Sequence, residues 1–335
     1  MNKFLIVRTD RIGDVVLTLP MAKLLKEKYP GSKVSFMCAP YTAPVVRACP
    51  FVDEIIEVIA EGKKIPVFRN IEQLKGKSFD NIFVVSPRLE FALIFLLAGY
   101  SKITGNGYRL YSVLFTNRIY EHRSKVEKHE LDYNLNMLYS EFQPVEYKKN
   151  IAVCLSVNEK LKTRGAEILQ ESGIDSEREL IILHPGSGGS SVDLPPAKMK
   201  ELAKNLSEDS RYSVLITGTS SEAQLCSKIA EGTEAKILNG EHSLEEFLGI
   251  ISNSRILIAN STGPIHIAAA MDKYTIGFYP KIKVTSAKRW GPYSDKGFVF
   301  EPELKCENCT REQCERLNCM NTIDTEKVLN LIKKL

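Results

Sequence analysis

The sequence predicts an α/β protein with two doubly wound, parallel sheets, and three observations indicate this class. The 335 residues correspond to two domains of roughly 150 residues each. Short apolar runs of buried-strand type alternate with segments of helical apolar spacing, which is the pattern of parallel strands joined by crossover helices. Glycine-rich turns follow several of these strands, at the strand ends where open α/β sheets bind ligands.

The first half of the chain opens on an apolar run that we interpret as a buried strand. The expected strands cover residues 4–7, 33–38, 54–59 and 81–85, and the expected helices cover 14–25, 91–98 and 127–142. The segment 91–98 is the most apolar stretch, but it is too short to cross a bilayer and is interpreted as a buried helix.

The second half repeats the alternation and closes with an amphipathic helix. The expected strands cover 180–183, 212–217, 255–259 and 274–278, and the expected helices cover 196–206, 220–231, 244–252, 263–271 and 324–335. We expect two domains, 1–160 and 161–335, whose sheets face each other across a cleft.

The composition is that of a globular protein with a sizeable core, since hydrophobic residues make up 44% of the chain. The net charge of +4 does not indicate a nucleic-acid partner, although it could attract an anionic substrate or membrane surface. The chain has no apolar run of about 18 residues and no export signal. We therefore expect a cytoplasmic protein that is at most peripheral to the inner membrane.

The first turn that could carry chemistry lies within 8–20. Gly13 gives this turn conformational freedom, and Asp14 stands where a helix begins. Asp14 could simply cap the helix. It could also be a carboxylate at the mouth of the cleft that accepts a proton from an attacking hydroxyl. The spacing leaves both interpretations open.

Two further turns follow strands of the second half. In 183–191, His184 precedes a run of Gly and Ser whose backbone amides could approach an anion. This loop lacks the signatures of a P-loop and of dinucleotide enzymes, and we interpret His184 as structural. After Thr217 and Gly218 comes Glu222, which could accept hydrogen bonds from a ribose or be a solvated residue at a helix start.

The last of these turns brings Ser261, Thr262 and Gly263 to the start of a helix. The first backbone amides of that helix would form an anion site suited to a diphosphate, and Ser261 and Thr262 could cap it. His266 could point to the phosphates or be a buried, hydrogen-bonded histidine.

Four of the eight cysteines are clustered near the end of the chain: Cys306, Cys309, Cys314 and Cys319. Four sulfurs could hold Zn²⁺ or an iron–sulfur cluster as a structural site, although the spacing is not that of a common zinc ribbon. Disulfides and reduced structural thiols are the alternatives.

Taken in order, these motifs resemble glycosyltransferase family 9, the ADP-heptose:lipopolysaccharide heptosyltransferases. The resemblance covers nearly the whole chain and rests on Ile-Gly-Asp14-Val-Val-Leu-Thr-Leu-Pro, His184-Pro-Gly-Ser-Gly-Gly, Asn260-Ser-Thr-Gly-Pro-x-His266, Arg289-Trp-Gly-Pro292 and the cysteine-bearing tail. It implies the GT-B architecture of two Rossmann-like domains facing across a cleft. It also implies an inverting transfer of heptose or a related sugar from an ADP-sugar to a lipopolysaccharide core or similar lipid-linked glycan, with no cofactor or metal required for the chemistry.

The same resemblance assigns residues to roles. Asp14 is the expected general base, and the N-terminal domain would bind the acceptor, with Arg8 and Arg11 available for its phosphates or carboxylates. The C-terminal domain would bind the nucleotide-sugar donor through Ser187, Gly188, Thr217, Gly218, Glu222, Ser261, Thr262, Gly263 and His266.

The sequence departs from the family pattern at one place. Family members often carry Lys or Arg two residues before a Trp-Pro pair after the Gly-Ser loop, whereas Val192 and Leu194 occupy the basic and Trp positions here. Another cation could serve in place of the missing one, and the candidates are Lys281, Lys283, Lys288 and Arg289.

Two alternatives to an active glycosyltransferase stay open. One is a non-catalytic nucleotide-sugar-binding protein of the same fold, and the other is a metal or redox protein organised by the tail cysteines.

Overall fold

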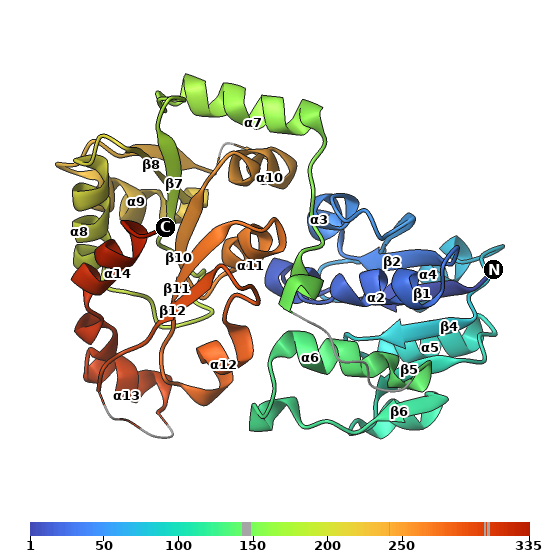
Figure 1. The fold of residues 1–335 in the computed structure, drawn as a ribbon. Helices are drawn as coiled ribbons and strands as arrows, with labels where there is room; N and C mark the ends of the chain where they lie inside the picture. The colour runs from blue at the N-terminus through green and yellow to red at the C-terminus, as the bar shows by residue number, and fades with distance from the viewer. Residues whose placement is uncertain (143–148, 241, 305, 307–308) are drawn as a thin grey trace. The chain divides into compact units, whose positions relative to one another are not determined.

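The computed structural model describes residues 1–142, 149–240, 242–304, 306 and 309–335, and the chain forms two compact units (Figure 1). These units are Met1–Ser156 and Val157–Leu335, and each contains one six-stranded parallel sheet. The predicted α/β class with two Rossmann-like sheets is confirmed. The structural division precedes the first helix of the second unit, whereas the predicted division after residue 160 falls at the start of that helix.

The first sheet has the strand order β3-β2-β1-β4-β5-β6. Its strands are β1 (Lys3–Val7), β2 (Lys33–Cys38), β3 (Glu54–Glu57), β4 (Asn81–Val84), β5 (Ile103–Asn106) and β6 (Asn117–Ile119). The α-helices of this unit are α1 (Ile12–Val16), α2 (Pro20–Lys28), α3 (Ala43–Arg47), α4 (Val67–Gln73), α5 (Leu89–Leu97) and α6 (Glu130–Leu135), and two of its 3₁₀ helices are η2 (Leu110–Leu114) and η4 (Asn136–Ser140).

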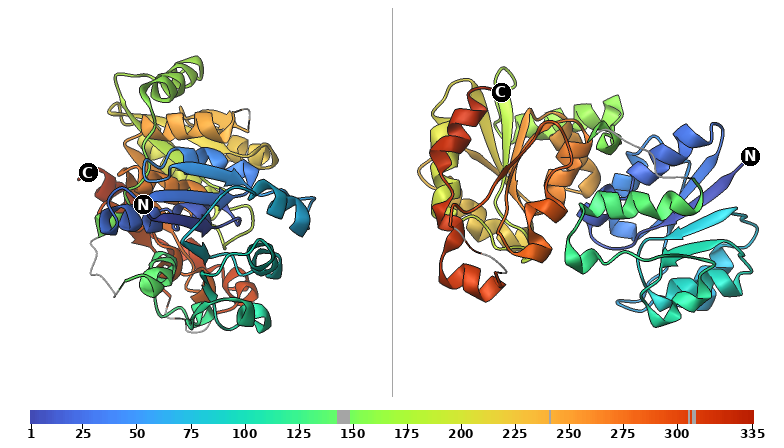
Figure 2. Two further views of the ribbon diagram at one scale, coloured as in Figure 1. Left: turned by 90° about the vertical axis from the view of Figure 1, so that its right-hand side faces the viewer. Right: turned by 60° about the horizontal axis from the view of Figure 1, so that its bottom comes forward.

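Helices cover both faces of this sheet (Figure 2), and its central strands are apolar after their first residues, Lys3 of β1 and Asn81 of β4. The side chains of α4 and α5 pack on one face against Leu5, Val7 and Ile82. On the other face, Phe4 packs against Tyr29 at the end of α2, with ring centroids 5.4 Å apart. The predicted helix at 91–98 is confirmed as α5, but it is buried on one side only: Phe91 and Phe95 are buried, whereas Leu96 and Leu97 are exposed.

Two predicted helices of this unit differ from the structure. The expected helix at 14–25 is two helices, because Pro20 lacks a backbone donor and starts α2 instead of continuing α1. The expected helix at 127–142 is only α6 followed by the tighter turns of η4. Its first residues lie outside the helix because Val126 has a left-handed backbone and the amide of Glu127 donates to the Tyr133 hydroxyl at 3.0 Å.

The second sheet has the strand order β12-β11-β10-β7-β8-β9. Its strands are β7 (Glu179–His184), β8 (Tyr212–Gly218), β9 (Lys236–Asn239), β10 (Ile256–Asn260), β11 (Tyr274–Phe278) and β12 (Gly297–Phe300). Its α-helices are α7 (Glu159–Glu171), α8 (Pro196–Ser207), α9 (Ala223–Ala230), α10 (Leu244–Ser252), α11 (Gly263–Ala270), α12 (Ala287–Trp290), α13 (Arg311–Arg316) and α14 (Thr325–Ile332).

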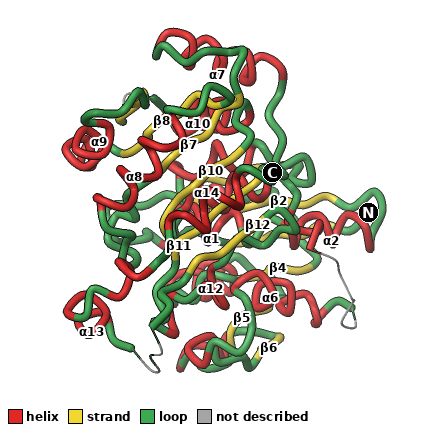
Figure 3. The backbone as a smooth tube through the Cα atoms, turned by 60° about the vertical axis from the view of Figure 1, so that its left-hand side comes forward, coloured by secondary structure: helices red, strands yellow, loops and turns green. Residues whose placement is uncertain are grey.

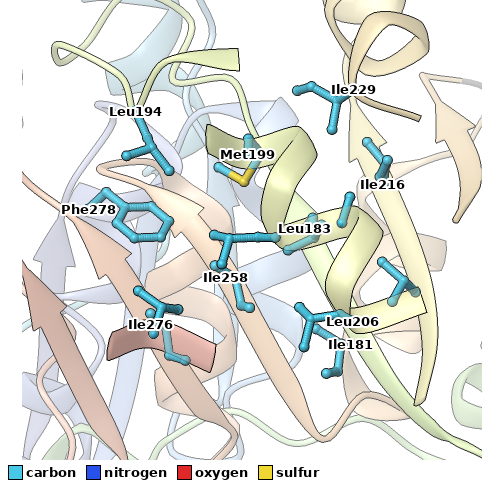
Figure 4. Close-up of a cluster of buried hydrophobic side chains, with 14 of the residues drawn as sticks. Ile181, Leu183, Leu194, Met199, Leu206, Ile216, Ile229, Ile258, Ile276 and Phe278 are labelled. Atoms are coloured by element: carbon cyan, nitrogen blue, oxygen red, sulfur yellow. The ribbon is translucent and has the colours of Figure 1, made fainter. Parts of the chain in front are cut away.

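The core of the second unit lies between this sheet and α8, α9 and α14. Figure 4 shows Leu183, Ile258 and Phe278 of the sheet beside Met199 of α8. On the opposite face, α7 packs on α10 at a contact of two glycines, where a Cβ on Gly165 would lie 2.3 Å from the Gly249 backbone. Only glycine allows the two helix backbones to approach this closely.

Both sheets have the doubly wound order in which the first and fourth strands of the unit are neighbours. Figure 3 shows these parallel strands in yellow, running through the middle of each unit. The chain turns away in opposite directions at this point, so the loops after β1 and β4, and after β7 and β10, leave room for ligands. Among the described helices, none is both long enough and apolar enough to cross a bilayer.

Candidate functional site

Three neighbouring strands of the second sheet end in the turns predicted to bind a donor. β7 lies between β8 and β10, and all three are parallel, so their carboxyl ends meet at one edge of the sheet. The turn after β7 holds Ser187 and Gly188, the end of β8 holds Thr217 and Gly218, and the turn after β10 holds Ser261 to Gly263. The structure therefore brings these predicted residues to the same edge.

Side-chain hydrogen bonds join the loop after β7 to the turn after β10. Asn260 is fully buried, and its Oδ1 accepts from the Leu194 amide at 2.8 Å while its Nδ2 donates to the Pro185 carbonyl. Ser190 Oγ donates to the Ser261 carbonyl at 3.0 Å. These bonds fix both turns to each other, and with them the amides that the sequence analysis predicts to bind an anion.

The helix α11 begins at this edge with Thr262 in the N-cap position. The Thr262 side chain makes no capping bond within the described chain, so the predicted side-chain cap is wrong and the first amides of α11 stay available to an anion. His266 follows in the first turns of the helix, is only 3% exposed and lies edge-on to Trp290, with ring centroids 6.5 Å apart.

His184 has a structural environment at the end of β7. The ring is buried, and its Nδ1 lies 2.9 Å from Thr217 Oγ1. Burial lowers the pKa of His184 to about 4, although the Glu222 carboxylate opposes this shift. The imidazole is therefore neutral at pH 7, as expected of a structural histidine.

Glu222 reaches back to cap its own helix and also lies beneath the Gly-rich loop. Its Oε2 accepts from the Thr219 amide at 2.9 Å. Burial raises the pKa of Glu222, but hydrogen bonds from the amide and hydroxyl of Thr219 outweigh burial and lower it overall. A Cβ on Gly186 would lie 1.8 Å from Glu222 Oε1, so a larger residue at that point of the loop would displace the Glu222 carboxylate.

The structure adds two residues to this site that the sequence analysis did not identify. Arg311 of α13 donates to the carbonyls of Gly189 at 3.0 Å and Ser191 at 2.6 Å. Asp193 lies at the other side of the loop, where burial raises its pKa to about 6 and hydrogen bonds from Ser187 oppose the shift. Arg311 was not among the four cations proposed to compensate for Val192.

In the first unit, β1 leads through a short turn into α1, where Asp14 lies. Arg11 occupies the N-cap position, so Asp14 stands inside the first turn and the capping interpretation is wrong. The Asp14 carboxylate forms a close ion pair with Arg8, and its side chain is 16% exposed. Thr18 Oγ1 donates to the Asp14 carbonyl at 2.7 Å and steadies this turn of the helix.

Arg8 is the centre of a buried network of charges. Its guanidinium, 6% exposed, also pairs with Asp10 at 2.8 Å and with Glu130 at 3.5 Å. Glu130 in turn forms an ion pair with Arg123, whose Nη1 donates to Asn134 Oδ1 at 2.9 Å. In the sequence, Glu130 and Asn134 are four positions apart, and this spacing places both side chains on one face of α6.

This network sets the proton affinity of Asp14. Burial raises the pKa of Asp14, Arg8 lowers it, and Asp10 and Glu130 raise it, with a net shift above the ordinary value of a carboxyl group. Burial raises the pKa of Tyr41, the Asp14 and Asp10 carboxylates add to this shift, and its hydroxyl donates to the backbone carbonyl of Asp10 at 2.7 Å. Arg8 is thus directed inward to Asp14, whereas Arg11 is exposed.

The described residues contain no group of three or more His, Cys, Asp or Glu side chains arranged to hold a metal ion. The residues predicted to bind the donor lie at strand ends of the second unit, among hydrogen-bond donors. The residue predicted to act on the acceptor hydroxyl, Asp14, lies after a strand end of the first unit and is paired with Arg8.

Comparison with known proteins identifies relatives along the whole chain. A Haemophilus influenzae protein described as a glycosyltransferase is 27% identical over 314 residues, covering 90% of each chain. Lipopolysaccharide heptosyltransferase 2 of Escherichia coli is 24% identical and covers 83% of this chain and 82% of its own.

Solved structures share the fold. A family 9 glycosyltransferase from Veillonella parvula covers 99% of this chain and 96% of its own, with a TM-score of 0.83 at 17% identity. The E. coli ADP-heptose heptosyltransferase II covers 100% of both chains, with a TM-score of 0.77 at 20% identity.

The family description that matches the sequence is glycosyltransferase family 9 (heptosyltransferase), over residues 67–320. This match confirms the resemblance seen in the ordered motifs. It begins after the Asp14 turn and ends within the cysteine-bearing tail. Because it covers most of the chain, the protein belongs to glycosyltransferase family 9 and is a glycosyltransferase with the α/β architecture of the heptosyltransferases.

Proposed function

We propose that this protein transfers a heptose or related sugar from an ADP-sugar to a lipopolysaccharide core or similar lipid-linked glycan, with inversion at the anomeric carbon and no metal at the reacting atoms. The observation that carries the donor half is the convergence of three turns at the ends of β8, β7 and β10. Two similar proteins point the same way, since one relative is named lipopolysaccharide heptosyltransferase 2 and one similar structure, an E. coli heptosyltransferase, was solved with ADP.

On the donor side, the available amides of α11 and the loop after β7 would hold the diphosphate. Negative charge that develops on the departing diphosphate would be stabilised by these preorganised donors. Glu222 would accept hydrogen bonds from the ribose hydroxyls, and His266 would lie near the phosphates. His184 stays neutral and fixes the end of β7.

On the acceptor side, Asp14 would take the proton of the attacking sugar hydroxyl as the new bond forms. A base needs a pKa raised toward the working pH, and burial together with Asp10 and Glu130 raises that of Asp14. Arg8 would orient the carboxylate, since it is buried and paired with it. Arg11, which is exposed, is the better placed of the two arginines to meet an anionic group of the acceptor.

The donor assignment can be tested by thermal protection with ADP-, GDP- and UDP-sugars, followed by transfer to a Kdo-bearing lipid. We expect ADP-sugars to raise the melting temperature most, and Glu222→Gln to reduce that gain because the neutral amide is a weaker acceptor for ribose hydroxyls. Glu231→Gln, in the same region but exposed, is the matched control. ADP binding without product formation from any of the donors would instead favour the non-catalytic binding protein.

We also propose that the first unit attaches peripherally to an anionic membrane through α5 and η2, which pack on each other. These segments expose large apolar side chains, with Leu97 58%, Leu110 97% and Val113 67% accessible. Basic residues adjoin them in the sequence at Lys102 and Arg109, and both are exposed. Apolar side chains beside basic ones suit the interface of an anionic bilayer.

Sedimentation with vesicles that contain anionic phospholipid tests this attachment. The double variant Leu97→Glu, Leu110→Glu should lose binding because both apolar contact and charge attraction are reduced. Leu317→Glu, exposed in the second unit, should bind as the wild type does. Equal sedimentation of all three proteins would contradict the attachment.

A further inference from the structure

Three aromatic rings gather on the surface of the first unit, in the segments that follow β5 and β6. The rings of Tyr108 and His122 are stacked, with centroids 3.8 Å apart and an angle of 21° between their planes. Tyr120 meets Tyr108 edge-on, with centroids 5.4 Å apart. We call these three residues the aromatic cluster. All three are exposed, Tyr108 to 48% and Tyr120 to 58%, and large exposed side chains that adjoin one another are typical of binding sites.

The backbone beneath holds the aromatic cluster in place. The Gly107 amide donates to the Ile119 carbonyl at 2.9 Å, which joins the chain just after β5 to the end of β6. The Tyr120 ring packs directly on Gly107, where a Cβ would lie 2.5 Å from the ring. The Tyr108 amide donates to Asn106 Oδ1 at 2.9 Å and so fixes the turn that follows β5. The rings are therefore positioned by the sheet edge below them.

Glu121, which separates Tyr120 from His122 in the sequence, points to the other side of the chain. Its Oε1 accepts from Asn136 Nδ2 at 2.6 Å and also pairs with Lys128. Successive side chains of an extended segment alternate in direction. The carboxylate thus anchors this segment to η4 and leaves both neighbouring rings on the exposed side.

The aromatic cluster lies at the edge of the first sheet that also carries Asp14. β1, β4, β5 and β6 are parallel neighbours, so the cluster and Asp14 follow carboxyl ends of the same sheet. Arg123, directly after His122, forms an ion pair with Glu130, and Glu130 pairs with Arg8 at 3.5 Å. Two strand intervals of about 4.8 Å each separate β5 from β1, so the cluster lies on the order of 10 Å to the side of the expected base.

We propose that the aromatic cluster binds a sugar ring of the acceptor glycan, other than the ring whose hydroxyl reacts at Asp14. This inference rests on the proposed function, which places the reacting hydroxyl at Asp14. One face of a sugar ring carries C–H groups and packs flat on an aromatic ring, while its hydroxyls project from the edge. Tyr108 would carry that face and Tyr120 would form a side wall. The phenol hydroxyls of both tyrosines can donate to and accept from sugar hydroxyls.

The neighbouring segment favours a sugar that is attached to a lipid. Ser112 Oγ of η2 donates to the Gly107 carbonyl at 2.9 Å, so η2 is fixed to the turn that carries the aromatic cluster. η2 exposes the aliphatic side chain of Leu110, which suits a bilayer, whereas the cluster presents ring faces with polar groups. A lipid-linked glycan would therefore place its lipid at η2 and one of its sugars on the rings.

Binding is tested by calorimetry on the full chain, with a Kdo-bearing core oligosaccharide from which the acyl chains have been removed. We expect Tyr108→Ala to weaken binding by about tenfold, because the ring face is lost. Tyr108→Phe keeps that face and should weaken binding by less than about twofold. Tyr139→Ala, which removes an exposed tyrosine of η4, should bind as the wild type does. Equal affinity of Tyr108→Ala and the wild type, or an equal loss in the Ala and Phe variants, would overturn stacking on this ring.

Turnover with the same oligosaccharide separates binding from chemistry. Tyr108→Ala should raise KM for the acceptor by about tenfold and leave kcat within about twofold of the wild type, because the ring lies away from the reacting atoms. An unchanged KM, with active wild type, would overturn the aromatic cluster and leave the proposed function standing. Tyr108-dependent binding of the oligosaccharide without transfer from any donor would overturn the proposed function and support the cluster.

Two further outcomes would also count against the sugar site. If the wild type bound no oligosaccharide, the aromatic cluster would not be a site for this class of glycan. If Tyr108→Ala kept the oligosaccharide but no longer sedimented with anionic vesicles, the rings would belong to the membrane contact of α5 and η2 instead.

Discussion

Replacing Asp14 with Asn is expected to lower kcat by about 10²–10⁴-fold, because the amide cannot accept the acceptor proton. The amide preserves the size of the side chain, and Arg8 can still donate to its oxygen. ADP affinity should be unchanged, since all predicted donor residues lie in the second unit. The measurement is initial transfer rate at saturating donor and acceptor, with ADP binding followed by calorimetry.

A matched control is Asp80→Asn, because Asp80 is exposed at the opposite end of the first sheet, where its carboxylate accepts from the Lys3 amide at 2.7 Å. It should retain nearly full turnover. If Asp14→Asn retained the wild-type rate, another group would have to remove the proton and the role of Asp14 as base would be refuted.

The second large effect is expected at Arg8, which is the buried partner of Asp14. Arg8→Met should lower the free energy of unfolding by about 3–5 kcal/mol, because it leaves the buried Asp14 carboxylate without its cation. Arg8→Lys keeps the charge but not the fork of donors, so its loss of stability should be smaller. Urea unfolding at pH 7 compares the three proteins.

The pH profile separates this structural effect from the effect on the base. Asp14 acts when ionised, so activity falls as the pH drops through its raised pKa. Loss of Arg8 would raise that pKa further and move the acid limb of kcat/KM to higher pH. Glu130→Gln removes a negative charge and leaves Arg8 more fully to Asp14, so the limb should move to lower pH. If the acid limb of kcat/KM stays at the same pH in both variants, a group other than Asp14 titrates there.

The central strands could be predicted from the sequence because they are buried on both faces and therefore carry runs of apolar residues. The bounds of β2 and β11 agree with the predicted 33–38 and 274–278. Four strands were missed: β5, β6, β9 and β12. The side chains of β6, β9 and β12 are largely exposed or half-buried, and β5 is buried but has a single large apolar residue, Ile103. Pairing with neighbouring strands keeps all four extended. No local pattern reports such pairing.

The site could be predicted only where its residues are close in the sequence. The turns at Ser187 and Thr262 each consist of a strand end, small residues and a helix start, and all of these are local signals. Arg8 and Asn134 are 126 positions apart, and Arg311 and Gly189 are 122 apart. A charged residue gives no sign of which distant partner it will meet, so these contacts required the structure.

The separation of the two sheets has a practical consequence for engineering the chain. Among the described residues, no strand is shared between the units. The hydrogen bonds on either side of Val157 belong to different units: the Ser156 amide donates to the Ala48 carbonyl, while the Asn158 side chain caps α7. A peptide inserted at Val157 would interrupt neither a ladder of strands nor a turn of helix. This position is therefore suited to the insertion of a protease site or a fluorescent tag.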